Sequence, residues 1–357
     1  AKEMHEALDE INPNIRLGLC SCMSLWDTDG VDTVTISKIL AGKTKPFIRL
    51  IGAPYWAVNK SWGNRLQNII ELERMERSWC EDENIEIFAE GDVYPRPRIN
   101  CPANYLELFD MAIRADSRFD GILKYGLDYI SNPGYETGYA MRHLKNKPIY
   151  DEIHKSFHDK KACGVRVYER MNKFSEMEIT DAVAGTCDVQ NIFFSPAARM
   201  LSDCSIPTVY DGEGICGIAF AENIHMVSDE AMKTGIIIDA RAAHILQSNG
   251  IDTGILSVGN QMNVDTEYFA DMDEYVSCVC KAYDMKISDK AKISSKFSYV
   301  TEDGITRKEI VGSYLYQNDK GHKFLVFTFD AYFNGESIYR SYARSMQIKN
   351  TIQHFFN

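Results

Sequence analysis

The sequence lacks any long apolar stretch and any segment dominated by basic residues. No run approaches the roughly 18–20 consecutive apolar residues that a membrane-spanning helix needs, so a membrane is not an expected partner. Acidic residues outnumber basic ones by 51 to 39, and the formal net charge is -12. A nucleic-acid-binding surface would show a basic patch instead, so nucleic acid is not an expected partner either.

The motifs of several common enzyme classes are also missing. No predicted strand is followed by Gly-x-Gly-x-x-Gly or by a Walker phosphate loop, and Gly212-Glu213-Gly214 is too short a match to indicate one. No Gly-x-Ser-x-Gly elbow is present. The histidines are scattered and do not show metal-ligand spacing, as at His5, His154, His158, His225 and His244. The sequence therefore predicts no cofactor and no metal.

The cysteines do not form a disulfide framework, although there are 10 of them. Such frameworks belong to small secreted domains, and this chain has 357 residues. Two Cys-x-Cys pairs, Cys20/Cys22 and Cys278/Cys280, would each place both thiols on one face of a strand. Because an isolated pair is a weak metal signal, we interpret most cysteines as buried, reduced thiols. Reduced thiols and the absence of a signal-peptide pattern favour a cytoplasmic location.

Short apolar segments alternate with amphipathic helical segments through the first half of the chain. Four strands are predicted, at Ile15–Cys20, Phe47–Gly52, Ile85–Glu90 and Gly121–Tyr125. Helical patterns lie between them, at Val34–Leu40, Trp62–Arg77 and Asn104–Ala115. The alternation predicts an α/β fold with a parallel sheet. The strand spacing is close to one unit of a (β/α)8 TIM barrel, in which about 250 residues make eight units.

Four such units are half a barrel, which would leave two parallel sheet edges open. The chain also begins within an amphipathic helical pattern, Ala1 to Leu8, without an initiator methionine. We therefore expect residues 1–158 to be the second half of a TIM barrel, strands 5–8, with the first four strands outside this sequence.

Barrel active sites gather at the carboxyl ends of the strands, so the residues found there are candidates for the site. The four ends, together with the loop after the third strand, supply Trp26, Asp27, Tyr55, Trp56, Glu90, Asp92, Arg96, Arg98, Lys124, Tyr125 and Asp128. Aromatic faces with a few carboxylates suit a sugar, because its C–H faces stack on rings while its hydroxyls bond to charged groups. These residues predict a site for a small carbohydrate substrate, although each aromatic alone fits a core position as well.

The third strand end offers the clearest catalytic candidate. Glu90 closes an apolar segment, Asp92 follows, and two prolines then prevent a helix from starting at once. Retaining hydrolysis of a glycosidic bond needs one carboxylate that attacks the anomeric carbon and a second carboxyl group that protonates the leaving oxygen. Glu90 is the predicted nucleophile, with Arg96 or Arg98 keeping it ionised. The alternatives are Asp92 as nucleophile, or a strand-end turn with solvated charges.

The second half of the chain shows a different pattern. Residues 159–285 predict a smaller α/β layer, with a strand at Ala162–Tyr168 and a helix at Ser195–Cys204 that has Ser195 as its N-cap. From about Lys290 onward alternation dominates, and residues 286–357 predict a succession of β-hairpins. The chain is thus expected to contain three domains.

The segment Asn84 to Tyr129 resembles the last two barrel strands of glycoside hydrolase family 42 β-galactosidases and their three-domain relatives. The similarity rests on Phe88-Ala89-Glu90 at one strand end and on Phe119-Asp120-Gly121-Ile122-Leu123-Lys124-Tyr125 at the next. In that family the nucleophile glutamate closes the seventh strand, which corresponds to Glu90. The resemblance implies a retaining exo-β-glycosidase that acts on terminal β-galactosides. It also implies a glutamine-amidotransferase-like trimerisation domain at 159–285, a small antiparallel β domain at 286–357, and a homotrimer.

Some features depart from the family pattern and leave alternatives open. The family's acid/base glutamate follows the fourth strand and is therefore expected outside this chain, although Asp27 and Asp128 are candidates within it. The loop from Gly91 to Arg98 is unlike the common version, and Lys124-Tyr125 stands where a tryptophan motif is typical. A β-mannosidase of the same plan is one alternative, and a non-catalytic carbohydrate-binding or scaffold protein is another. An amidotransferase-like enzyme is disfavoured because Cys187 and Cys204 do not occupy a strand-to-helix turn.

Overall fold

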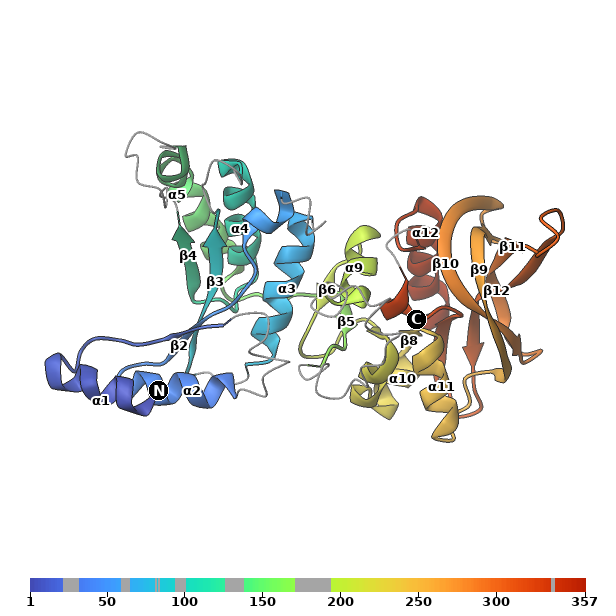
Figure 1. The fold of residues 1–357 in the computed structure, drawn as a ribbon, viewed down its shortest axis with the longest axis horizontal. Coiled ribbons are helices and arrows are strands. Elements are labelled where there is room, and N and C mark those ends of the chain that lie inside the picture. Colours follow the sequence, from blue (N-terminus) through green and yellow to red (C-terminus); the bar gives the residue numbers. More distant parts are fainter. Residues whose placement is uncertain are drawn as a thin grey trace. The chain divides into compact units, whose positions relative to one another are not determined.

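A computed structural model describes residues 1–21, 32–58, 65–80, 82, 84–93, 101–125, 138–170, 194–334 and 338–357. The described residues form two compact units (Figure 1). Unit 1 lies within Ala1–Ala162, and unit 2 contains Cys163–Arg170 and the described residues from 194 to 357. One unit has a parallel sheet and the other a larger mixed sheet, so the chain belongs to the α/β class.

The sheet of unit 1 has four strands in the order β1-β2-β3-β4, and every neighbouring pair is parallel. The strands are β1 (Leu19–Cys20), β2 (Phe47–Arg49), β3 (Glu86–Asp92) and β4 (Gly121–Tyr125). The parallel sheet predicted from the sequence is therefore present. The predicted end of the third strand at Glu90 is two residues short, because pairing with β4 continues to Asp92 opposite Tyr125.

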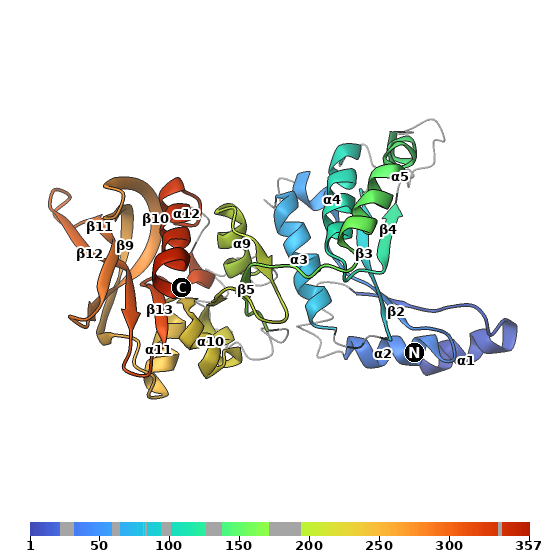
Figure 2. The same cartoon turned by 180° about the vertical axis from the view of Figure 1, so that it is seen from behind.

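The helices of unit 1 are α1 (Lys2–Ile11), α2 (Thr33–Ala41), η1 (Pro54–Val58), α3 (Leu66–Ser78), α4 (Ala103–Ala115) and α5 (Gly138–Phe157). The α-helices follow the predicted alternation except for α5, and the short 3-10 helix η1 was not predicted either. Helix α5 packs against α4, and no pattern in the sequence predicted it (Figure 2). Its residues Met141, Leu144 and Ile149 are exposed, whereas Tyr139 and Tyr150 are buried, and Pro148 lies inside the helix.

The two faces of this sheet differ in chemistry. Ile48 of β2 and Ile87 of β3 are fully buried in a hydrophobic cluster that also contains Leu50 and Cys80. Because side chains alternate along a strand, Arg49 and Glu90 belong to the opposite face. One face thus builds the core, while the other carries charged and aromatic side chains.

Unit 2 contains a nine-stranded mixed sheet in the order β10-β9-β11-β12-β13-β8-β7-β5-β6. Its parallel strands are β5 (Val165–Val167), β6 (Thr208–Val209), β7 (Gly217–Ala219) and β8 (Ile236–Ile238). Its antiparallel strands are β9 (Ile255–Phe269), β10 (Glu274–Ile287), β11 (Lys292–Val300), β12 (Arg307–Gln317) and β13 (Lys323–Phe327). The predicted hairpin succession is present from β11 to β13, but the end of the predicted β domain at 286–357 is helical, in residues 342–356. The long strands β9 and β10 were not predicted, and residues 256–261 of β9 are exposed.

The helices of unit 2 are α9 (Pro196–Asp203), η2 (Ala221–Met226), α10 (Asp229–Thr234), α11 (Ala240–Ser248), η3 (Ala331–Phe333), α12 (Tyr342–Thr351) and η5 (Ile352–Phe356). Ser195 caps α9 as predicted, with its hydroxyl accepting the Ala198 N–H at 3.2 Å. Strand β13 pairs with β8 in parallel, so one sheet crosses the predicted boundary at residue 285. The three-domain division at 1–158, 159–285 and 286–357 stays a prediction.

Candidate active site

Strand β3 carries Glu90 near its carboxyl end. Phe88, Glu90 and Asp92 share one face of the sheet, while Ile87 and Ala89 point to the opposite face and are fully buried. Glu90 is only 5% exposed and Asp92 only 8%. Two carboxylates therefore lie close together in a setting with little solvent, where interactions between charges are strong.

The neighbouring strand β2 supplies the cation of the site. Arg49 pairs in register with Phe88, so its side chain lies on the same face as Glu90. One of its terminal nitrogens forms an ion pair with Glu90 Oε1. Beyond the end of β2, the backbone N–H of Gly52 donates to Glu90 Oε2 at 3.2 Å. Each oxygen of Glu90 thus accepts a hydrogen bond from β2 or from the segment that follows it.

Helix α3 adds two carboxyl groups that were not among the predicted site residues. Glu73 is 0% exposed, and its Oε1 accepts the backbone N–H of Glu90 at 2.9 Å. Glu76 is 2% exposed, and its Oε2 accepts the backbone N–H of Ile51 at 3.2 Å. Gly52 has a φ of +154°, and a Cβ at this position would lie 3.0 Å from Glu73 Cγ. The close approach of α3 to this strand end therefore requires a glycine.

A signal for both carboxyl groups exists in the sequence. Glu73 lies four residues after Ile69, and Glu76 lies four residues after Leu72. Ile69 and Leu72 form part of the buried stripe of α3, and residues four apart share a helix face. The amphipathic pattern predicted for Trp62–Arg77 does not distinguish these two buried carboxyl groups from charged residues on the exposed face.

Burial and mutual repulsion perturb the titration of this cluster. Burial raises the pKa of Glu90, and the charge of Asp92 adds to this effect, whereas Arg49 opposes it. Burial also raises the pKa of Glu73 and of Glu76 well above the ordinary range. Glu90 is the member that forms the ion pair with Arg49. The arrangement favours an ionised Glu90 with neutral acids at Glu73 and Glu76.

Four other predicted residues lie near the carboxyl end of this sheet. Tyr125 of β4 is in register with Asp92, so the two share the face of Glu90, and the Tyr125 side chain is 38% exposed. Tyr55 and Trp56 lie in η1 in edge-to-face contact, with ring centroids 6.3 Å apart. Trp56 is only 2% exposed, which is the burial of a core residue. The structure therefore brings Asp92 and Tyr125 to the face of Glu90 and packs Trp56 into the interior.

Lys124 does not join the face that carries Glu90. It occupies the alternate position on β4, and its Nζ lies 3.1 Å from Glu107 Oε1 on α4 and 3.0 Å from His143 Nδ1 on α5. It also forms an ion pair with Asp110, which is fully buried. The prediction that Lys124 and Tyr125 both line one pocket overlooked the alternation along a five-residue strand. Lys124 instead joins β4 to the two helices.

The remaining predicted site residues lie outside the described ranges. They are Trp26, Asp27, Arg96, Arg98 and Asp128. The cation that contacts Glu90 within the described chain is Arg49, which was not a predicted site residue because it lies inside a predicted strand rather than after it.

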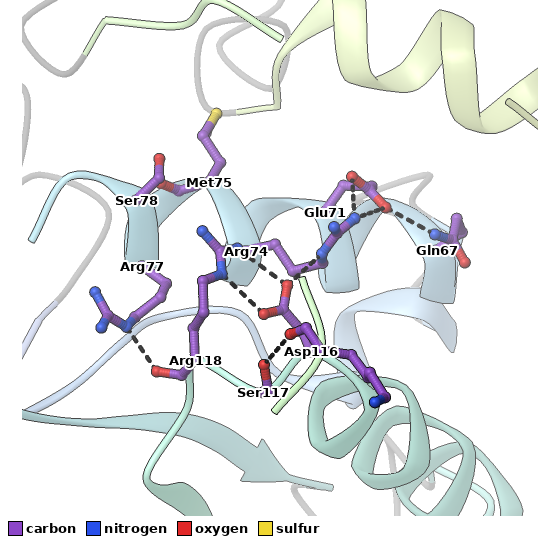
Figure 3. A network of polar contacts seen from close by, with 10 residues as sticks. Gln67, Glu71, Arg74, Met75, Arg77, Ser78, Asp116, Ser117 and Arg118 are labelled. Atoms are coloured by element: carbon purple, nitrogen blue, oxygen red, sulfur yellow. Dashed lines mark hydrogen bonds and ion pairs between the residues drawn. The ribbon is translucent and has the colours of Figure 1, made fainter. Parts of the chain in front are cut away.

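A second polar network fixes the helix that carries Glu73 (Figure 3). Arg74 Nε donates to Asp116 Oδ2 at 2.7 Å, and Arg118 Nε donates to Asp116 Oδ1 at 2.9 Å. Arg77 Nε donates to the backbone carbonyl of Arg118 at 2.8 Å. These bonds hold α3 against the segment between α4 and β4. Glu73 therefore projects from a helix that is anchored by its neighbour Arg74.

Unit 2 offers a cavity of about 540 Å³ that begins at β5 and reaches α10. The guanidinium of Arg166 lies over the ring of Tyr168 there, 4.9 Å from its centroid. The carboxylate of Glu230 on its rim is 82% exposed and pairs with Lys233. Burial raises the pKa of the Cys204 thiol elsewhere in this unit to about 12, which leaves it a poor nucleophile. Cys187 lies outside the described ranges.

The described ranges contain no cluster of three or more His, Cys, Asp and Glu side chains that could hold a metal ion. All eight cysteines in these ranges are unpaired, and Cys278 and Cys280 are buried. No helix within the same ranges is long and apolar enough to cross a membrane.

No protein-family model and no curated protein sequence matches the chain. Among solved structures it is similar to the cold-adapted β-galactosidase from Rahnella sp. R3, with a TM-score of 0.54 and 9% identity. The similarity covers 98% of this chain and 55% of that one, so the chain spans about half the length of that enzyme. The exo-β-1,4-mannosidase Op5Man5 from Opitutaceae bacterium strain TAV5 gives a TM-score of 0.47 at 10% identity, over 88% of this chain and 59% of that one. At such identities the similarity to the β-galactosidase shows a shared fold.

Proposed function

We propose that this chain is part of a retaining exo-β-glycosidase of the type found in family 42, and that Glu90 is its nucleophile. The observation that carries the proposal is the setting of Glu90: a nearly buried carboxylate at the carboxyl end of a parallel strand, held by Arg49 and by a backbone N–H. Parallel α/β sheets place their catalytic residues at this end. The shared fold with a β-galactosidase agrees with the proposal.

In the proposed reaction the Glu90 carboxylate attacks the anomeric carbon while the bond to the leaving oxygen breaks. A second carboxyl group gives its proton to that oxygen, and a covalent glycosyl-enzyme forms. The second group then takes a proton from water, the water oxygen attacks the anomeric carbon, and Glu90 is released. The resemblance puts this acid/base group outside the present chain, about 5–5.5 Å from Glu90 in a retaining site.

The described residues have defined parts in this proposal. Arg49 and the Gly52 N–H keep Glu90 ionised and oriented. Asp92 and Tyr125, on the same face, are proposed to bind sugar hydroxyls and to stack on the ring. The proposal keeps Trp26, Asp27, Tyr55, Arg96, Arg98 and Asp128 as further sugar contacts. A cytoplasmic homotrimer is part of the same proposal, and light scattering would measure its mass.

The experiment that tests this function is hydrolysis of aryl β-galactosides and aryl β-mannosides by the full-length protein, followed by NMR of the first-formed sugar. The proposal expects turnover of the galactoside with a β-configured product. Turnover of the mannoside alone would mean that the substrate is a β-mannoside and not a β-galactoside. An α-configured product would overturn the double-displacement mechanism.

A second candidate is a non-catalytic carbohydrate-binding protein. It is favoured by the low exposure of Glu90 and by the protein donors on both of its oxygens, since a carboxylate so satisfied is a weaker nucleophile. Sugar binding without turnover in the same experiment would support this candidate.

A further inference from the structure

The backbone pairing of β2 with β3 ends at Phe88, two residues before Glu90. Arg49 is the last residue of β2 in register with β3, opposite Phe88, and the Leu50 N–H then donates to the Phe88 carbonyl at 2.8 Å. The next donor on that side of β3 is the N–H of Glu90, and a continuing parallel ladder would give it a carbonyl of the segment after β2. That backbone partner is replaced here.

The replacement is the carboxyl group of Glu73. Its Oε1 accepts the Glu90 N–H at 2.9 Å, from a side chain that is 0% exposed. Glu76, one turn further along α3, accepts the N–H of Ile51 in the same way at 3.2 Å. The helix thus completes the hydrogen bonding of both strand ends, and the Gly52 N–H becomes available to bond Glu90 Oε2.

The charged groups that face Glu73 come from three elements. Glu90 lies on β3, Arg49 lies on β2, and Glu76 lies on α3 itself. Burial and the charge of Glu90 disfavour ionisation of Glu73, against the opposing effects of Arg49 and of the Glu90 N–H. The second oxygen of Glu73, Oε2, has no hydrogen-bond partner within the described chain. An ionised Glu73 would be a buried charge without a donor on that oxygen, so the neutral acid is the stable form.

We propose that Glu73 is a positioning residue for Glu90: as a neutral acid it holds the end of β3 open to the Gly52 N–H and so fixes the orientation of the Glu90 carboxylate. The inference rests on the proposed function, because orientation of Glu90 matters for turnover only if Glu90 reacts. Glu73 itself touches the backbone of Glu90 and does not contact the reacting atoms.

Two substitutions of Glu73 distinguish the role of its hydrogen-bond-accepting oxygen from the role of its carboxyl group. Glu73→Gln keeps the shape and the accepting oxygen without a carboxyl group, and Glu73→Leu removes the acceptor at similar volume. We expect Glu73→Leu to lower kcat by about 100-fold, the scale of a misplaced catalytic group, with KM close to the wild-type value. We expect Glu73→Gln to keep the wild-type kcat and pH profile. Glu71→Gln, on the same helix but bonded to Arg74, is the matched control and should not differ from wild type.

A readout besides activity keeps the inference testable if the Leu variant is poorly folded or the wild type shows no turnover. Hydrogen exchange of the Glu90 N–H, followed by mass spectrometry of the folded protein, should be faster in Glu73→Leu than in Glu73→Gln. Equal kcat in wild type and Glu73→Leu, equal losses in both variants, or equal exchange in both would overturn the positioning role. Absence of turnover in the wild type would overturn the proposed function, and the exchange rates would then decide on the hydrogen bond alone.

Discussion

The two units each bury a carboxylate beside an arginine, but they balance the charge differently. In unit 2, Glu267 Oε2 accepts from Arg344 at 2.6 Å, and its Oε1 accepts from the Ser295 hydroxyl at 2.6 Å. The Arg344 guanidinium also lies 4.7 Å from the centroid of the Phe327 ring. One anion meets one cation there, and each oxygen of the anion has a donor.

In unit 1 the corresponding pair of Glu90 and Arg49 lies among additional acidic side chains. Glu73, Glu76 and Glu90 are all nearly buried, and within the described chain Arg49 is the cation whose charge acts on all three. Catalytic sites hold groups whose environments push their pKa values apart. The surplus of acid in unit 1 therefore agrees with the proposed role of Glu90, and the Glu267–Arg344 pair in unit 2 is expected to contribute to stability.

The largest effect should come from removing the proposed nucleophile. Glu90→Gln keeps the shape of the side chain but cannot attack the anomeric carbon, so kcat should fall by about 10⁴-fold or more, as when a hydrolase loses its nucleophile. Glu86→Gln is the matched control on the same strand and face, because Glu86 pairs with Arg16 and Lys45 at the other end of β3. Near-normal turnover of an aryl glycoside by Glu90→Gln would contradict the assignment.

The balanced pair should show the opposite behaviour, a large change in stability. Arg344→Leu leaves Glu267 buried without its cation, so the free energy of unfolding should fall by about 3–5 kcal/mol. Urea denaturation measures this change. The double variant with Glu267→Gln should recover much of the loss, because the uncompensated charge is then gone. A single variant as stable as wild type would show that the pair is not structural.

Replacing Arg49 should move the pH profile. Its charge opposes the burial that raises the pKa of Glu90, so Arg49→Met should raise that pKa further. The acid limb of kcat/KM should move to higher pH by about one unit or more. Arg49→Lys retains the charge and should move it less, and Arg16→Gln, at the far end of β3, should not move it. An unchanged acid limb in Arg49→Met would mean that Glu90 does not titrate in that limb.

The smallest effect concerns the network that anchors α3. Burial alone would raise the pKa of Asp116, but Arg118 and Arg74 lower it to about 2. The group therefore stabilises the fold above its unfolded pKa of 3.8, and this stabilisation, about 2 kcal/mol, is lost as the pH falls from about 4 to about 2. Asp116→Asn should abolish this part of the slope in acid unfolding curves. If the Asp116→Asn variant loses stability with falling pH as steeply as the wild type, other carboxylates cause this loss.

The sequence predicted the elements that have strong periodicity or clear caps. The alternation in unit 1, the cap at Ser195 and the hairpins after Lys290 were recognised because each depends on local residues alone. Helix α5 was missed because its apolar and polar residues are only weakly segregated and Pro148 lies inside it. Strand β9 was missed because its first half lacks the alternation that half-buried strands show.

The sequence predicted site residues only where a side chain with suitable chemistry lies at the end of a predicted strand. Glu90 and Asp92 fulfil both conditions, and the structure adds Arg49 and Glu73 from elements that no local pattern connects to them. When only the pattern of a helix is known, its charged residues are expected to face solvent. Nothing in the sequence shows that α3 approaches the end of β3. Contacts between distant segments therefore supplied the cation and the buried acids.

The most direct test of the central claim is to trap the glycosyl-enzyme. The full-length protein is incubated with an activated 2-deoxy-2-fluoro-β-galactoside, which slows release of the covalent intermediate, and its peptides are then analysed by mass spectrometry. We expect one sugar bound to Glu90, and no label in the Glu90→Gln variant. A label on Asp92 or on another residue, or turnover that continues without a label, would contradict it.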